Sequence, residues 1–305
     1  MLTVLMSSKK LTLLFLLALL IACPFFFIGG PNYQSSSLFR AFWDWGHILF
    51  FSGLVVVVQP MVKVKGWRFG VLISLIVFVV GGIIEIVQSY TGRDGNWQDL
   101  LRDLSGTWFG LFWLQKATVL VWMGRALTFA LLWPSVWAVF LAAFAQVQAE
   151  KYFPVISSFE HYTDARRWKG KVELSSEYHS EGDHSLRAYF NTQRYSPIAL
   201  DEFLGDWTGY SIVAVDIYNP QPEVVELIFR VNDLEHDNGK GLYTDRFNRK
   251  LFIEHGWNHI AIPIAEIEHA PENRLMNLHE IKRVLFFTSS LPQPKILYID
   301  NFLLK

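Results

Sequence analysis

The stretch GGIIEIVQSYTGRDGNWQDLLRDLSGTWFG, residues 81–110, decides how the rest of the chain is interpreted. It begins at the end of one hydrophobic run and ends inside another. Between the two runs it carries ionisable and amide side chains: Glu85, Gln88, Arg93, Asp94, Asp99, Arg102 and Asp103. Ionisable groups at a membrane boundary are costly unless they are paired, hydrated or used. The stretch therefore predicts a polar site at the edge of a helical membrane domain.

The composition divides the chain into two parts. Its 305 residues are enough for about two domains. Residues 11–148 are dense in Leu, Val, Phe and Trp, whereas residues 150–305 have the composition of a soluble domain. We predict a transmembrane helical domain at 1–148 and an extracytoplasmic β-domain at 149–305. The net charge of −1 gives no global field that would attract nucleic acid, so no such partner is expected.

Five hydrophobic runs predict about five transmembrane helices, with approximate bounds 11–30, 47–62, 69–87, 100–120 and 126–144. A bilayer core of ~30 Å needs about 20 helical residues. The first run also has the form of a signal peptide, since Lys9 and Lys10 precede it. We favour a retained helix because no small-x-small cleavage site precedes the polar stretch 31–37. The fourth run is the least apolar of the five.

The basic residues predict the orientation of this bundle. Lys9 and Lys10 place the N-terminus in the cytoplasm, and Lys63, Lys65 and Arg68 place the loop after the second run on the same side. The chain is then an integral protein of the cytoplasmic (inner) membrane, with its β-domain outside. The lone Cys23 excludes a disulfide framework or a cysteine metal site within one chain.

This topology brings polar groups from four separated segments to one depth on the outer side of the membrane. Asp99, Asp103, Gly106 and Gly110 are also spaced along one helical stripe, acidic at its start and small beyond it. Small residues let membrane helices approach closely, so the stripe is expected to face the bundle.

Each polar group has a functional and a structural interpretation. Asp44 lies three residues before His47 and can orient it for acid–base work or anion binding, or it can cap the helix. Glu85 is either a functional acid or an interfacial side chain that reaches water or pairs with Arg93. Arg93 can grip a phosphate or carboxylate, or pair with Glu85 or Asp99. The candidate catalytic pocket comprises Asp44, His47, Glu85, Gln88, Arg93, Asp99 and Asp103, with no cofactor expected in the helical domain.

Two of these segments resemble a known family. DWGHILFF at 44–51 and EIVQSYTGRDGNWQDLLRDLSGTWFG at 85–110 are similar to the pattern of the VanZ-like membrane proteins. That pattern has an Asp and a nearby His opening one helix, then E-x-x-Q, an Arg-Asp-like turn and D-x3-N-x2-G-x3-G. Asp103 stands where the pattern has Asn, and an ionised carboxylate lacks the amide's donor. The resemblance covers about residues 10–120 and implies an association with low-level resistance to the glycopeptide teicoplanin, without supplying a biochemical activity.

From residue 151 onward, about ten short β-prone segments alternate with turns. This pattern predicts an all-β sandwich or jelly roll. The domain resembles carbohydrate-binding-type jelly rolls of the galactose-binding-like class, through FE at 159–160, GDHSLR at 182–187, GWN at 256–258 and YIDNF at 298–302. The resemblance implies a structural calcium held by Glu160 and Asp300, with Asp183 as a weaker third ligand. The alternative is that these acids make caps and turns.

A sugar site would need aromatic platforms and polar side chains. The β-domain supplies both types, although most of its aromatic residues are expected in the core. The candidate ligand-binding residues are Arg230, Asp233, Tyr243, Arg246 and Trp257. The loop 232–245, rich in charge and Gly, is the expected rim of the site.

Two classes of function stay open on the sequence. One is an integral cell-envelope protein whose polar outer pocket acts on or binds a lipid-linked or glycan envelope component, with an outer sugar-binding-like module. The alternative is a non-catalytic, membrane-anchored glycan-binding or scaffold protein. Transport is disfavoured because the polar residues gather at one side of the membrane. The expected partners are membrane lipid and an envelope glycan or lipid-linked precursor, and neither the reaction nor the oligomeric state follows from the residues.

Overall fold

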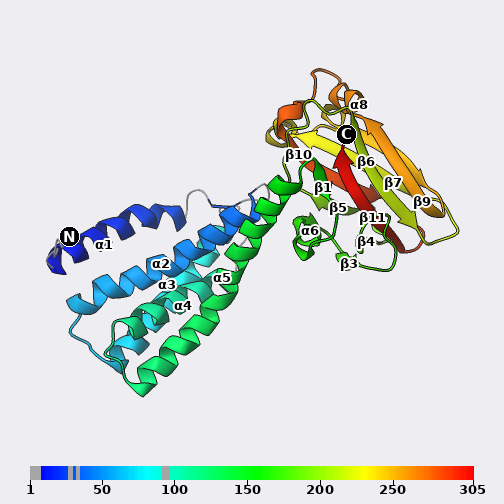
Figure 1. Ribbon diagram of the computed structural model, residues 1–305. Coiled ribbons are helices and arrows are strands. Elements are labelled where there is room, and N and C mark those ends of the chain that lie inside the picture. Colours follow the sequence, from blue (N-terminus) through cyan, green and yellow to red (C-terminus); the bar gives the residue numbers. More distant parts are fainter. Residues whose placement is uncertain (1–7, 27–29, 32–34, 91–96) are drawn as a thin grey trace, which may run out of the picture. The chain divides into compact units, whose positions relative to one another are not determined.

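The computed structural model describes residues 8–26, 30–31, 35–90 and 97–305. The chain divides into two compact units, Met1–Ala142 and Ala143–Lys305. Figure 1 shows helices in the first part of the chain and a β-sandwich in the second. Each unit has its own core and is described by itself.

The first unit consists of helices. Their bounds are α1 (Ser8–Ala22), the short 3-10 helix η1 (Cys23–Phe26), α2 (Ser37–Met61), α3 (Trp67–Tyr90), α4 (Trp97–Trp113) and α5 (Val119–Tyr152), the last of which continues into the second unit. Helix α2 begins at an N-cap, Ser36, whose hydroxyl accepts a hydrogen bond from the backbone N–H of Phe39.

Among the described residues, three helices are long and apolar enough to cross a membrane: α2, α3 over Trp67–Gln88, and α5. Helix α4 has 17 residues and therefore rises only about 26 Å. It is shorter than the predicted span because it ends at Trp113, and its first half carries Asp99, Arg102 and Asp103. Helix α1 has 15 described residues. The structure thus supports three candidate spans of the predicted five.

Helix α4 packs against α2 through its small residues, as the stripe predicts. An ideal Cβ on Gly106 would lie 2.4 Å from the carbonyl oxygen of Ile48, and one on Gly110 would lie 2.9 Å from that of Ser52. The Ser52 hydroxyl donates to the Gly106 carbonyl at 2.8 Å, across the two helices. Only glycine permits backbones to approach this closely. Hydrophobic residues of α2, α3 and α4 complete the core beside this contact, among them Phe51, Val55, Ile73, Val77 and Leu111.

The second unit is an antiparallel β-sandwich. One sheet has the order β3-β4-β11-β6-β9, with β1 paired to β11, and the other has the order β2-β5-β10-β7-β8. The strand bounds are β1 (Val155–Ser157), β2 (Trp168–Lys169), β3 (Val172–Ser175), β4 (Ser185–Phe190), β5 (Ser196–Leu200), β6 (Ile212–Asn219), β7 (Val225–Asp233), β8 (Phe247–Ile253), β9 (Gly256–Pro263), β10 (Ile281–Thr288) and β11 (Lys295–Leu304). Short helices connect them: α6 (Tyr162–Arg167), α7 (Leu234–Asn238), η2 (Tyr243–Asp245), α8 (Ile264–Glu268) and η3 (Leu278–Glu280).

Alternation along the strands decides which side chains enter the core. In β6, Val213, Val215 and Ile217 are buried, as their alternation with polar or smaller residues predicts. In β7, Leu227 and Phe229 point into the sandwich. The intervening residues of β7 therefore lie on the outer face of the second sheet, and this places a row of side chains where a ligand can reach them.

Candidate functional site

The helical unit contains a buried His–Asp pair. His47 of α2 and Asp103 of α4 lie 2.8 Å apart, measured from the imidazole Nδ1 to a carboxylate oxygen, and the residues are only 4% and 2% exposed. The sequence prediction that Asp44 orients His47 is wrong in this detail. The α2–α4 glycine contact brings Asp103 to the imidazole, and the partner therefore comes from another helix.

Asp44 instead pairs with Arg102, which the sequence analysis did not place in the site. The Arg102 guanidinium lies 2.8 Å from the Asp44 carboxylate and also pairs with Asp99, three residues earlier in α4. Arg102 thereby joins α2 to α4 one residue away from Asp103. The i, i+3 spacing of Asp99 and Arg102 was the available signal for the local half of this contact.

Helix α3 contributes the predicted Glu85 and Gln88, both buried. The Gln88 side-chain amide donates to the Phe26 carbonyl at 2.6 Å, so it ties α3 to η1. Gly81 brings α3 against Asp103, because an ideal Cβ there would lie 3.1 Å from the carboxylate. Glu85 lies about one turn beyond Gly81. Arg93, the predicted anion clamp, lies outside the described residues.

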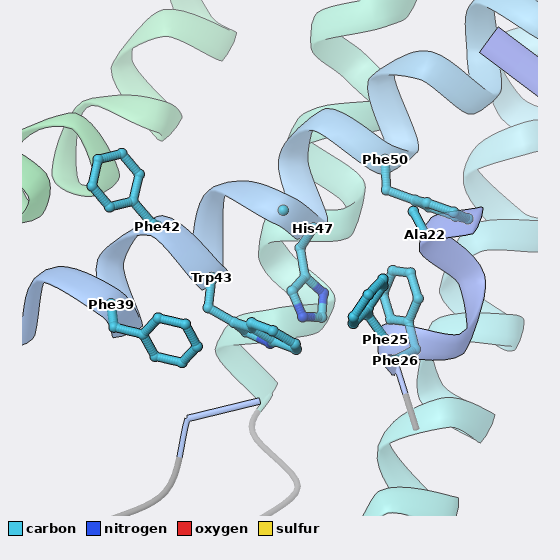
Figure 2. A pocket seen from close by; sticks show the side chains of 9 residues that line it. Ala22, Phe25, Phe26, Phe39, Phe42, Trp43, His47 and Phe50 are labelled. Atoms are coloured by element: carbon cyan, nitrogen blue, oxygen red, sulfur yellow. The ribbon is translucent and has the colours of Figure 1, made fainter. Parts of the chain in front are cut away.

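An aromatic cavity of about 380 Å³ opens beside His47. In Figure 2 the imidazole lies between Trp43 and the two phenylalanines of η1. The Phe26 ring meets the imidazole edge-on at a centroid distance of 5.0 Å. The lining residues come from α1, η1 and α2: Ala22, Phe25, Phe26, Phe39, Phe42, Trp43, Gly46, His47 and Phe50. Such a cavity suits an apolar chain whose polar end reaches the imidazole.

The β-sandwich contains a second cavity, a cleft of about 550 Å³ on the outer face of its second sheet. Strands β5, β7, β8 and β10 and residues that flank them supply the walls: Tyr195, Pro197, Ile228, Arg230, Tyr243, Arg246, Asn248, Arg249, Lys250, Leu285, Phe287 and Ser289. Three predicted ligand-binding residues, Arg230, Tyr243 and Arg246, thus lie in one cleft.

The structure places the other two candidates elsewhere. Asp233 is fully buried and accepts hydrogen bonds from the Arg274 guanidinium at 2.5 and 2.8 Å. It also caps α7 by accepting from the His236 backbone N–H. Trp257 lies on β9 of the opposite sheet, with its ring 5.2 Å from that of Tyr218. Neither residue lines the cleft.

The predicted calcium ligands are engaged by backbone N–H groups. The Glu160 carboxylate accepts from the N–H groups of Asp183 and His184, each at 3.0 Å. The buried Asp300 carboxylate accepts from the N–H groups of Ser180 and Glu181, at 2.7 and 3.1 Å. Within the described ranges, no group of three or more His, Cys, Asp or Glu residues is placed to hold a metal ion. The structural calcium therefore stays a prediction.

Fold and sites together define a chain with apolar helices long enough to span a membrane, followed by an antiparallel β-sandwich that bears an aromatic and basic cleft. The sandwich resembles carbohydrate-binding modules.

Three solved structures illustrate this likeness. A family 11 carbohydrate-binding module from Clostridium thermocellum, in complex with a β-1,3-1,4-mixed-linked tetrasaccharide, is 15% identical over 49% of this chain and 93% of that chain, with a TM-score of 0.37. CBM28, a module specific for non-crystalline cellulose, is 12% identical over 49% and 92%, with a TM-score of 0.35. An exo-β-agarase is 14% identical over 50% of this chain and only 24% of its own, with a TM-score of 0.40.

No protein-family model matches the chain, and no curated protein matches it. The resemblance of the helical unit to the VanZ-like proteins, and the glycopeptide resistance that it implies, therefore stay predictions.

Proposed function

We propose that the chain is an integral cell-envelope protein whose helical unit binds the apolar chain of a lipid-linked envelope component, with the lipid's polar end at His47. In the same proposal the cleft of the β-sandwich binds glycan. The observation that carries the first part is the buried His47–Asp103 pair at the wall of an aromatic cavity. The tyrosines and arginines gathered in the cleft support the second part.

The chemistry of the pair supports a ligand with an exchangeable or charged end. A carboxylate that accepts from Nδ1–H holds the imidazole in one tautomer and leaves Nε2 as an acceptor. In an enzymatic form of the proposal, His47 exchanges a proton with the ligand and Asp103 is its positioning residue. Arg102, paired with both Asp44 and Asp99, then holds α2 to α4 beside the His47–Asp103 pair.

The five-span count and the orientation belong to this proposal. Basic residues before α1 and between α2 and α3 favour a cytoplasmic N-terminus and an extracytoplasmic sandwich. A membrane-impermeant thiol reagent is expected to label a cysteine at residue 240 from outside intact cells, in a chain whose Cys23 has been replaced by serine. Labelling only after the membrane is opened would overturn the orientation.

Binding of a polyprenyl phosphate to the purified full chain in detergent tests the lipid site. We expect Trp43→Ala and His47→Ala to weaken binding about tenfold each, since the first removes apolar cavity wall and the second removes the polar partner. Asp103→Asn is expected to weaken binding of the phosphate form more than of the matching polyprenol. Retention of the radiolabelled lipid with the purified chain provides the readout for every variant.

Trp137→Ala is the matched control, because Trp137 is an exposed aromatic residue of α5 that does not line the cavity. Its binding should equal that of the unchanged chain. If Trp43→Ala and His47→Ala also bind the lipid unchanged, the cavity is not the lipid site. That result would favour the alternative in which the helical unit only anchors a non-catalytic glycan-binding or scaffold protein in the membrane.

A further inference from the structure

The cleft of the β-sandwich carries an unusual excess of positive charge. Four cationic side chains line it, and among the described lining residues there is no carboxylate: the cations are Arg230, Arg246, Arg249 and Lys250. A cleft that binds only neutral sugar has no need of this excess, since hydroxyl groups are recognised equally well by amides and carboxylates.

Two of these cations, both on β8, are already paired with carboxylates. The Arg249 guanidinium lies 2.8 Å from the Glu266 carboxylate, and the Lys250 ammonium lies 2.9 Å from that of Glu226. Their side chains are between 41% and 63% exposed, and the pairing leaves little net charge to offer a ligand. The excess is therefore carried by the other two cations.

Arg230 and Arg246 make no ion pair within the described part of the chain. A terminal nitrogen of Arg230 lies 3.1 Å from His236 Nε2, and the Arg246 guanidinium lies 5.0 Å from the centre of the Tyr243 ring. Burial and the neighbouring Arg230 lower the pKa of His236, so its imidazole is neutral and accepts from Arg230. His236 Nδ1 in turn donates to the Asp245 carbonyl at 2.9 Å.

Three buried polar atoms of the cleft have no hydrogen-bond partner among the described residues. They are the Nε atoms of Arg230 and Arg246 and the Oδ1 atom of Asn248. Buried polar groups are nearly always satisfied, and unsatisfied ones in one cleft indicate a missing partner. Two of the three atoms are donors on cations, so the complementary group is a negatively charged acceptor.

The electrostatics of the site agree with this geometry. Burial, followed by the charges of Arg246 and Arg283, lowers the pKa of Arg230 to about 10. Burial likewise lowers the pKa of Arg246. The guanidinium groups stay protonated at neutral pH, yet they are held together at an electrostatic cost that an anion would relieve.

Aromatic side chains stand beside the two arginines. Tyr243 and Tyr195 are 68% and 55% exposed, and Tyr195 meets the Phe287 ring edge-on at 6.1 Å. Exposed rings in a concave site offer flat apolar faces to the C–H side of a sugar ring. Charged and aromatic contacts thus occur together within one cleft.

We propose that the cleft binds an anionic glycan, with a carboxylate or phosphate group of the polymer held by Arg230 and Arg246 and a sugar ring against Tyr243. This inference rests on the proposed glycan-binding function of the sandwich and names the chemical class of its ligand. The anion would accept from the guanidinium N–H groups of these two arginines, which line the cleft.

The test measures binding of the purified full chain in detergent to three immobilised polymers. They are polygalacturonate, a glycerol-phosphate polymer and a neutral mixed-linkage β-glucan. We expect at least one anionic polymer to bind about tenfold more tightly than the neutral one, with a preference that shrinks as salt is raised. The two anionic arms distinguish a carboxylate from a phosphate as the recognised group.

Arg230→Gln and Arg246→Gln are each expected to reduce binding of the anionic polymer about tenfold while sparing any neutral binding. Arg246→Lys keeps the positive charge but lacks the planar guanidinium, so it should bind the anionic polymer more tightly than Arg246→Gln and less tightly than the unchanged chain. Arg166→Gln, at an exposed arginine of α6 outside the cleft, is the matched control and should bind as the unchanged chain does. Should Arg230→Gln fail to fold, the two Arg246 variants decide the question.

The possible results distinguish failure of anionic-glycan binding from failure of glycan binding by the sandwich. If the neutral glucan binds as tightly as the anionic polymers, and the Arg246 variants bind unchanged, the anionic class is overturned while glycan binding stands. If none of the three polymers binds, both the inference and the proposed role of the sandwich fail. Anionic binding that Arg166→Gln reduces as much as Arg246→Gln is non-specific charge attraction and also overturns the inference.

Discussion

Gly106→Ala is expected to destabilise the helical unit by roughly 3 kcal/mol, the upper range for overpacking a tight interface. The new methyl group would lie 2.4 Å from the Ile48 carbonyl oxygen and 2.9 Å from the Ile48 Cα, both backbone atoms. Neither can rotate away, so α4 must move away from α2. That movement also lengthens the 2.8 Å contact between His47 and Asp103. Thermal unfolding of the detergent-solubilised chain measures the loss.

Gly82→Ala is the matched control for this prediction. It makes the same substitution inside helix α3, and an ideal Cβ there meets no atom of the described residues within 4 Å. Alanine is the better helix former by about 1 kcal/mol, so this variant should be neutral or slightly more stable. Gly106→Ala is therefore expected to lower the unfolding temperature, whereas Gly82→Ala should leave it unchanged or raise it slightly. Equal shifts would show that the α2–α4 contact is looser than described.

Asp233→Ala is expected to destabilise the β-sandwich by roughly 3 kcal/mol, because it removes one partner of a buried ion pair. The carboxylate is fully buried and bonds two nitrogens of Arg274. It also accepts from the backbone N–H groups of His236 and Asn277, at 2.9 and 2.8 Å. One substitution therefore removes a helix cap, a loop anchor and the partner of a guanidinium. Denaturant unfolding, monitored by hydrogen exchange of the β7 amides, measures the loss of unfolding free energy.

The pKa of Asp233 gives the same prediction a pH signature. Burial alone would raise it, but the bonds from Arg274, Asn277 and His236 outweigh burial and hold the pKa below its ordinary value of 3.8. The unfolded state then binds more protons than the folded state between the two pKa values. Stability from this group is complete above 3.8 and is lost as the pH falls through the lower, folded value. Asp233→Ala should remove that part of the acid sensitivity.

Glu235→Ala provides the control for Asp233→Ala. Glu235 lies near the same guanidinium, 3.6 Å from Arg274, but its side chain is 66% exposed. Exposed ion pairs contribute between about 0 and 1 kcal/mol, so this variant should be close to the unchanged chain. A loss as large as that of Asp233→Ala would contradict the assignment of the stability to the buried carboxylate.

The partner of His47 differs between the sequence prediction and the structure. Spacing along one helix suggests Asp44 as the partner, because only local neighbours can be inferred from a single sequence. The imidazole instead meets Asp103, 56 residues away, which faces α2 because Gly106 and Gly110 allow close approach. The small-residue stripe was visible in the sequence, but the partner that it brings to His47 was not.

The β-sandwich gives a second example. Composition predicted that Arg230, Tyr243 and Arg246 belong to a ligand site, and the structure places all three in one cleft. The sequence prediction also included Trp257, which lies in the other sheet. Composition does not show which strands share a sheet, because strand order within a sandwich does not follow chain order. The residue types of a sugar site could be predicted from the sequence. Which of those residues lie on the same face of the sandwich could not.

The sequence by itself determined the division into an apolar helical half and a β-rich half, the strand alternation and the glycine stripe of α4. These features follow from hydrophobic periodicity and from local backbone preferences, which act between residues near in the chain. Only the tertiary structure decided that Asp103 pairs with His47 and that Arg102 joins Asp44 to Asp99. It also decided that Arg230 and Arg246 share a cleft in which no described carboxylate pairs with them. Those contacts join distant segments, and the packing of whole elements sets them.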